Sequence, residues 1–177
     1  GLLLLSCKTP LAIAEIQTNK NIYITPELPV DKTMDAVIQP YKQELEGKMN
    51  TKISHTKIEL SKAGDNSSLG NLLADYTFQG ADDWAAKNSL PRVDAAVINI
   101  GGIRTIIPKG DIYTKQIYEV MPFENEIVII KMKGKDLESL FDYYLKTQKN
   151  NPVSNLEIET ENGKLSKKLI GGKTIDY

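Results

Sequence analysis

The sequence contains little cysteine, little histidine and no long uninterrupted apolar run. Its one cysteine, Cys7, has no second thiol with which to form a disulfide inside the chain. No apolar run approaches the roughly 20 residues that a membrane-spanning helix needs. Basic charge is not in excess either, because 22 lysines and arginines stand against 23 aspartates and glutamates. This balance disfavours a nucleic-acid polymer or an anionic membrane surface as the partner, since both select basic patches.

The residues that are present indicate one domain of mixed secondary structure. The chain has 177 residues, 41% of them hydrophobic, which is enough to bury one ordinary core. Apolar residues at helical spacing predict helices over 34–49, from Ser67 or Ser68 to about 84, and over 136–144. Apolar or alternating runs predict strands over 21–25, 52–60, 93–98 and 127–132, and a hairpin of 153–160 with 164–170 around Glu161-Asn162-Gly163. We therefore expect an α+β fold, a mixed β-sheet with packed helices.

The first residues predict a lipid anchor. Leu2 to Leu5 resemble the end of a secretory signal, and Leu4-Leu5-Ser6-Cys7 resembles a bacterial lipoprotein processing site with an acylated cysteine. A polar stretch with several prolines follows, as in a tether; the alternative is a short buried strand with a core cysteine. We expect a signal remnant at 1–7 with Cys7 lipidated, a tether at 8–31 and a domain at 32–177. Such a protein would be lipid-anchored in the cell envelope or periplasm.

The segment Asn99-Ile100-Gly101-Gly102-Ile103-Arg104 is the strongest candidate for a binding site. It follows a predicted strand, and two glycines allow a sharp turn that a ligand can approach closely. The arginine offers a rigid fork of donors that matches phosphate or carboxylate oxygens. The segment thus indicates an anion near a strand end, and the alternative is a tight turn with a solvated arginine.

Further motifs in register give a family resemblance. They are Ser67-Ser68-Leu69-Gly70-Asn71-Leu72, Gly110-Asp111-Ile112, Pro122-Phe123-Glu124-Asn125 and Gly134-Lys135-Asp136-Leu137. In this order, with the segment at 99–104 between the first two, they resemble the C-terminal domain of the 5′-nucleotidase family over about 52–177. In the family a loop with a second aromatic follows the position of Tyr177, so we expect this domain to be truncated at its C-terminus.

The resemblance implies a division of labour. In 5′-nucleotidases the N-terminal domain holds two metal ions and the catalytic residues, and the C-terminal domain binds the nucleoside. By resemblance Arg104 would contact phosphate, Asn99 the nucleoside, and Phe123 would stack on the base, with Gly101 and Gly102 forming the turn. The alternative for Phe123 is core packing beside Met121.

The chain also departs from the family pattern. An arginine that contacts phosphate in many members is replaced by Ala63, with Lys62 beside it, and an acidic position is occupied by Asn66. Asn71 and Asp75, four residues apart, are expected to orient loops. The one histidine, His55, is expected to be an ordinary strand residue, and Asp82-Asp83 a solvated helix turn.

These observations predict a substrate-recognition domain for a nucleoside phosphate, acting in nucleotide catabolism. We expect no catalytic residue, no metal site and no cofactor in this chain, because one histidine cannot supply a dinuclear centre. Divalent metals and hydrolysis would belong to a separate metallophosphoesterase partner. The alternatives are a non-catalytic nucleotide- or nucleoside-binding protein of the envelope and a structural domain without ligand.

Overall fold

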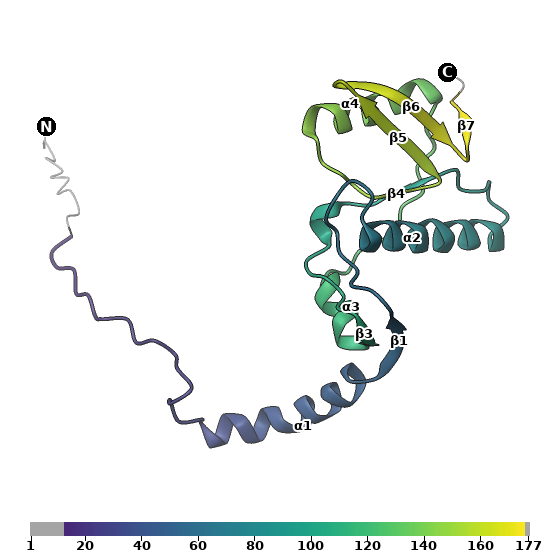
Figure 1. Ribbon diagram of the computed structural model, residues 1–177. Helices are drawn as coiled ribbons and strands as arrows, with labels where there is room; N and C mark the ends of the chain where they lie inside the picture. The colour runs from purple at the N-terminus through teal and green to yellow at the C-terminus, as the bar shows by residue number, and fades with distance from the viewer. Residues whose placement is uncertain (1–12, 176–177) are drawn as a thin grey trace, which may run out of the picture. The chain divides into compact units, whose positions relative to one another are not determined.

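The computed structural model describes residues 13–175 (Figure 1). The chain divides into two units, residues 1–41 and residues 42–177. In the first unit residues 13–25 form neither helix nor strand, so the prediction of a strand over 21–25 is wrong. The prediction for Cys7 lies outside the described residues. No helix within 13–175 is both long enough and apolar enough to cross a membrane.

Helix α1 (Lys32–Met49) is capped at its N-terminus by Asp31. The Asp31 carboxylate accepts hydrogen bonds from the backbone N–H groups of Thr33 and Met34, at 2.9 and 3.1 Å. A carboxylate there satisfies N–H groups that the helix itself cannot pair, and its charge suits the positive end of the helix dipole. Pro40 lies inside the helix. The helix predicted over 34–49 is confirmed.

The described part of the second unit contains three further α-helices and three small antiparallel sheets (Figure 1). The helices are α2 (Ser68–Lys87), α3 (Thr114–Val120) and α4 (Gly134–Thr147). The strands are β1 (Lys52–Thr56), β2 (Ala96–Val97), β3 (Gly110–Tyr113), β4 (Val153–Ser154), β5 (Leu156–Glu161), β6 (Lys164–Ile170) and β7 (Lys173–Thr174). β1 pairs with β3, β2 with β4, and β6 lies between β5 and β7. The predicted α+β class is confirmed.

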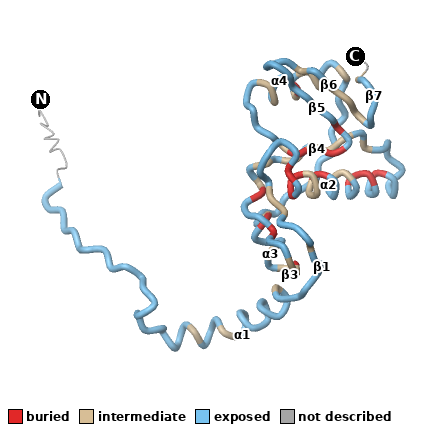
Figure 2. The backbone as a smooth tube through the Cα atoms, in the orientation of Figure 1, coloured by how far each residue is buried: buried red, intermediate tan, exposed pale blue. Residues whose placement is uncertain are grey.

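A small apolar core lies at the N-terminal end of α2. Its buried members are Leu69, Ile103, Ile107, Ile112 and Val120. Figure 2 marks buried stretches along α2 and on β4, whereas the β5–β6 hairpin is mostly exposed or half-buried. Because Ile103 is a core residue, the segment 99–104 is attached to this core.

The C-terminal hairpin follows the prediction closely. Asn162 and Gly163 connect β5 to β6 with φ values of 51° and 74°. The type I′ turn, whose twist matches that of paired strands, needs positive φ at both central residues. Asn and Gly adopt positive φ more easily than other residues do. On the other side of β6, Lys168 donates to Glu138 of α4 at 2.6 Å.

Two predicted strands are shorter than the sequence suggested. Only Ala96–Val97 of the run 93–98 pairs, because β4 offers just two residues before Asn155, at φ 55°, turns the chain into β5. β1 ends at Thr56 rather than at residue 60, although Leu60 forms an isolated bridge with Ile107. In both places the length of the partner strand, which periodicity does not reveal, sets the length of the pairing.

The strand predicted over 127–132 is wrong. These residues lie outside every helix and strand, and the backbone of 126–132 makes no hydrogen bond to another described residue. The large apolar side chains in it are between 47% and 73% exposed: Ile127, Val128, Ile129, Ile130 and Met132. A strand needs a neighbour that completes its backbone hydrogen bonds, and residues 13–175 provide none for this segment.

Candidate functional site

The side chain of Asn99, the first residue of the turn at 99–102, helps to form that turn. The Asn99 amide oxygen accepts a hydrogen bond from the Gly101 N–H at 3.0 Å, and the Gly102 N–H donates to the Asn99 carbonyl at 3.0 Å. Ile100–Gly102 thereby form a single 3₁₀ turn directly after β2. A Cβ added to Gly101 would lie 3.2 Å from the Asn99 amide oxygen, so glycine keeps this close approach open. The sharp turn expected at the two glycines is present.

A second segment, at Asn151 and Pro152, accepts hydrogen bonds from the backbone at the turn. The Asn151 side-chain oxygen accepts from the Ile100 N–H at 3.1 Å, and the Pro152 carbonyl accepts from the Ile98 N–H at 3.0 Å. The Tyr144 hydroxyl of α4 donates to the Asn151 carbonyl at 2.8 Å, and burial raises the pKa of this phenol to about 12. The phenol therefore stays protonated at neutral pH and remains a donor, which ties α4 to the turn.

Arg104 points outward from an anchored backbone. Ile103 is fully buried, while the Arg104 N–H donates to the Val120 carbonyl at 2.8 Å. The Arg104 side chain is exposed, and its nearest polar contact is a long 3.5 Å approach to the Gly101 carbonyl. No ion pair within residues 13–175 occupies this guanidinium. An anion can therefore reach it.

Phe123 lies beside that arginine. The Arg104 Cζ atom is 5.6 Å from the centroid of the Phe123 ring, a cation–π contact, and Phe123 is 50% exposed. Phe123 is thus not buried in the core beside Met121. Through Arg104, which approaches both the Gly101 carbonyl and the Phe123 ring, the turn formed by Asn99, Gly101 and Gly102 lies near a guanidinium and an aromatic ring.

The sequence did not predict the contact that Lys62 makes with the turn. Its Nζ atom donates to the Ile103 carbonyl at 2.5 Å, which places the ammonium at the same turn as Arg104. The bridge between Leu60 and Ile107 brings this lysine there, with backbone bonds of 2.8 and 2.9 Å. That bridge spans a large sequence separation, so no local signal around Lys62 could have identified the contact.

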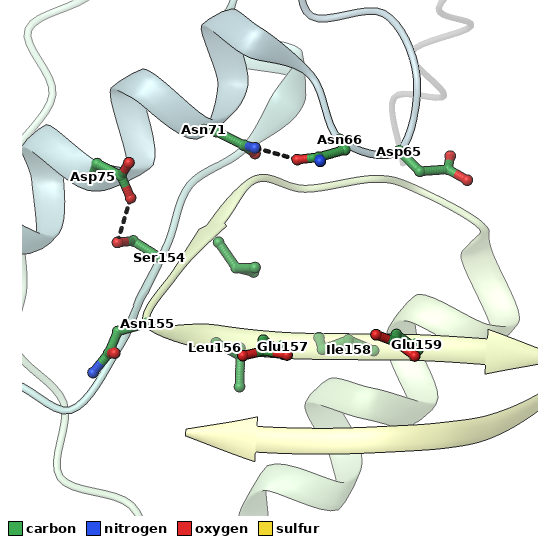
Figure 3. Close-up of a pocket in the computed structure, with 11 residues that line it drawn as sticks. Asp65, Asn66, Asn71, Asp75, Ser154, Asn155, Leu156, Glu157, Ile158 and Glu159 are labelled. Carbon is green, nitrogen blue, oxygen red and sulfur yellow. Dashed lines mark hydrogen bonds between the residues drawn. The ribbon is translucent and has the colours of Figure 1, made fainter. Parts of the chain in front are cut away.

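A separate polar pocket of about 490 Å³ opens beside α2 (Figure 3). Asn71 donates to the Asn66 side chain, and the Ser154 hydroxyl donates to Asp75 at 2.6 Å. Asn71 and Asp75 thus fasten the loop before α2 and strand β4 to the helix, as expected for loop-orienting residues. The acidic residues at the pocket are Asp65, Asp75, Glu157 and Glu159. None of the residues of the turn lines this pocket.

Several ionisable groups form ion pairs in which no residue of the turn takes part. Asp82 is buried and accepts from Arg92 Nε at 2.6 Å, so the prediction of a solvated helix turn is wrong for this residue. The Arg92 hydrogen bond, with help from the Val93 N–H, lowers the pKa of Asp82 to about 2. His55 lies on β1 and contacts Asp111 at 2.8 Å.

The donor set does not fit a dinuclear metal centre. Within residues 13–175 no three histidine, cysteine, aspartate or glutamate side chains gather as possible ligands. The chain also holds one histidine in all. We therefore assign no chemical step to a metal held by these residues.

Comparison with known proteins places this arrangement in a family. A sequence model described as "5′-nucleotidase, C-terminal domain" matches residues 47–171. The 5′-nucleotidase of Vibrio cholerae is 26% identical, and the alignment covers 88% of this chain and 28% of that protein. Protein UshA of Escherichia coli is 28% identical over 89% of this chain and 28% of its own length. This chain spans just over a quarter of the length of these curated relatives.

A solved structure agrees with the sequence relatives. The crystal structure of a 5′-nucleotidase precursor from Thermus thermophilus has a TM-score of 0.56 and 26% sequence identity, covering 80% of this chain and 29% of that one. The fold is therefore that of an α+β domain found in 5′-nucleotidases. The chain belongs to the 5′-nucleotidase C-terminal domain family, as its motifs predicted.

Proposed function

We propose that this chain is the substrate-recognition half of a 5′-nucleotidase-type hydrolase in nucleotide catabolism. The observation that carries the proposal is the contact of an exposed guanidinium that has no ion pair among the described residues, that of Arg104, with the half-exposed aromatic ring of Phe123 beside the anchored turn. Arg104 would take the phosphate through two parallel hydrogen bonds, and Phe123 would stack on the base. Asn99 would position the nucleoside, with its carbonyl side already engaged in shaping the turn.

Hydrolysis would require a second polypeptide or domain. A metallophosphoesterase half would hold the divalent metals and activate the attacking water, while this half would hold and orient the nucleoside phosphate. The residues of this chain then contribute by binding and alignment, since holding the phosphate ester in one orientation lowers the entropic part of the barrier. The relatives support this division, because each is more than three times as long as its match with this chain.

A calorimetric titration of the full chain with AMP and with adenosine tests the proposal directly. We expect both ligands to bind, AMP more tightly, and added salt to narrow the difference because it screens the phosphate contact. Binding of neither ligand would overturn the proposal and favour a structural domain. Binding without any gain in hydrolysis when a co-purifying metallophosphoesterase is added would favour a nucleotide sensor.

We also propose that the protein is lipid-anchored through Cys7 in the cell envelope. The support is the sequence Leu4-Leu5-Ser6-Cys7 and the polar stretch after it. Each acyl CH₂ group adds about 0.8 kcal/mol of membrane affinity, so more than one chain gives firm attachment. In the native host, Cys7→Ala should move the protein from the membrane fraction to the soluble fraction. Continued membrane association of that variant would contradict the proposal.

A further inference from the structure

The backbone immediately before Lys62 is held in place by hydrogen bonds of Leu60 and Ser61. Leu60 is paired with Ile107, and the Ser61 carbonyl accepts from the Leu69 N–H of α2 at 2.9 Å. The Ser61 N–H in turn donates to the Ser68 hydroxyl at 3.1 Å. Residue 62 therefore leaves a fixed stretch of backbone, and its side chain has a defined origin.

The Lys62 ammonium binds the carbonyl of the peptide unit that joins Ile103 to Arg104. The ammonium donates to the Ile103 carbonyl at 2.5 Å, and the N–H of the same peptide unit, that of Arg104, donates to the Val120 carbonyl at 2.8 Å. A peptide unit is planar, so hydrogen bonds at both of its ends fix its rotation. The direction in which the Arg104 side chain leaves the backbone follows from that rotation.

The ammonium also has donors to spare. Of its three N–H groups, one is used by the Ile103 carbonyl, and the ammonium makes no second hydrogen bond or ion pair among residues 13–175. No carboxylate among these residues pairs with Lys62 or with Arg104. Two uncompensated positive charges at one turn suit a ligand with two negative charges, and a phosphate monoester carries close to two at neutral pH.

We propose that Lys62 is a positioning residue that fixes the Ile103–Arg104 peptide and also gives the site its second positive charge. The inference rests on the proposed nucleotide binding and narrows the ligand to a phosphate monoester dianion. It also accounts for Ala63, since a lysine one position earlier delivers a cation to the turn by its own hydrogen bond rather than by a guanidinium fork.

Three substitutions separate the two effects. Lys62→Met removes both the donor and the charge, Lys62→Gln keeps a donor for the Ile103 carbonyl without the charge, and Lys62→Arg keeps both. Lys57 is the matched control, because it is an exposed lysine five positions earlier with no contact to the turn, and it receives the same Met and Gln changes.

Hydrogen exchange of the Arg104 amide in the free protein measures the positioning role. We expect faster exchange in Lys62→Met and near wild-type exchange in Lys62→Gln and in the Lys57 variants. Titration with AMP and adenosine measures the charge. A hydrogen bond to a charged group contributes more to binding than a neutral one. Lys62→Met and Lys62→Gln should therefore each lower the affinity for AMP about tenfold or more, and the affinity for adenosine less than about twofold.

The two readouts also distinguish this proposal from the proposed function. If the wild-type chain binds neither ligand, nucleotide recognition and the charge role fail together, and the exchange rate alone decides whether Lys62 fixes the turn. If AMP binds but Lys62→Met changes the Arg104 amide and the AMP affinity no more than Lys57→Met does, the Lys62 proposal is overturned and nucleotide recognition stands. If Lys62→Met lowered the affinities for AMP and adenosine equally, Lys62 would have a structural role only.

Discussion

At the scale of single residues, Arg104 and Phe123 contact each other in the protein without ligand. Their cation–π contact contributes about 0.5–1 kcal/mol at an exposed site. A ligand phosphate that draws the guanidinium away from the ring also frees that ring face for a base. Phosphate and base contacts at this site are therefore expected to be coupled rather than independent.

The fork of Arg104 should matter more than its charge. Arg104→Lys keeps the positive charge but replaces two parallel donors by a point charge, so AMP affinity should fall while adenosine affinity changes little. Calorimetric titration of both ligands, at low and high salt, measures the two losses. Equal losses for AMP and adenosine would remove Arg104 from the phosphate contact.

The ring of Phe123 should act on both ligands alike. Phe123→Ala should weaken AMP and adenosine each by about 1–3 kcal/mol, because base stacking does not depend on the phosphate. Tyr76→Ala, at an exposed aromatic residue on α2, is the control and should leave both affinities unchanged. An unchanged affinity in Phe123→Ala, with the fold intact by circular dichroism, would return Phe123 to a structural role.

The buried carboxylate of Asp82 predicts a stability that depends on pH. Its folded pKa, about 2, lies below its ordinary value of 3.8, so the stabilisation is complete above about pH 4 and is lost as the pH falls towards 2. Arg92→Gln removes the main cause of the lowered pKa, and should therefore cost stability at pH 6 but little at pH 2. Urea unfolding at several pH values measures this, with Asp83→Asn as the exposed neighbour control. A pH-independent difference between wild type and Arg92→Gln would contradict the assignment.

At the scale of secondary-structure elements, two glycines of α2 should respond in opposite directions to the same substitution. A Cβ on Gly70 would lie 2.7 Å from the Pro152 ring, which cannot rotate away, whereas a Cβ on Gly80 would meet nothing within 4 Å. Gly70→Ala should destabilise the fold by about 1–3 kcal/mol through overpacking. Gly80→Ala should stabilise it by about 0.5–1 kcal/mol through helix propensity.

Thermal and urea unfolding of the two variants measure this contrast. Since Pro152 also accepts a bond from Ile98 just before the turn, Gly70→Ala should in addition weaken AMP binding. Stabilisation by both substitutions would show that α2 and the segment at 152 do not pack as described.

Helices could be predicted from the sequence better than strands, for a physical reason. A helix satisfies its backbone hydrogen bonds within the same segment, so the apolar spacing that predicts α4 is a local signal in the sequence. The β5–β6 hairpin was equally legible because its turn residues and both strands are adjacent in sequence. Pairing between distant segments leaves no local mark, which explains the short β2 and the missing strand at 127–132.

The candidate site divides in the same way. The turn at 99–104 and its glycines could be predicted, because the strand, the glycines and the arginine are consecutive. The approach of Phe123 to Arg104 came only with the family resemblance, and its geometry needed the structure. The resemblance drew attention to Lys62 as the neighbour of Ala63, but its hydrogen bond to the Ile103 carbonyl could not be predicted, because the Leu60–Ile107 pairing that brings it there is long-range.

At the scale of the whole molecule, the purified chain should not hydrolyse nucleotides. AMP incubated with the chain and Mn²⁺ or Zn²⁺ should release no phosphate above background, since residues 13–175 gather no set of metal ligands and the sequence has one histidine. The Vibrio cholerae 5′-nucleotidase is the positive control. Metal-dependent phosphate release that survives repeated purification would refute the division of labour proposed here.

The unpaired segment at 127–132 has a consequence for the protein in concentrated solution. Four of its six residues are β-branched and it has no proline and no glycine, a composition from which steric zippers form, and here its large apolar side chains are exposed. Glu126 before the segment, Lys131 within it and Lys133 after it are the charges that oppose stacking of such segments. Colloidal stability of the isolated chain should therefore rest on these three charges, and high salt, which screens them, should promote its aggregation.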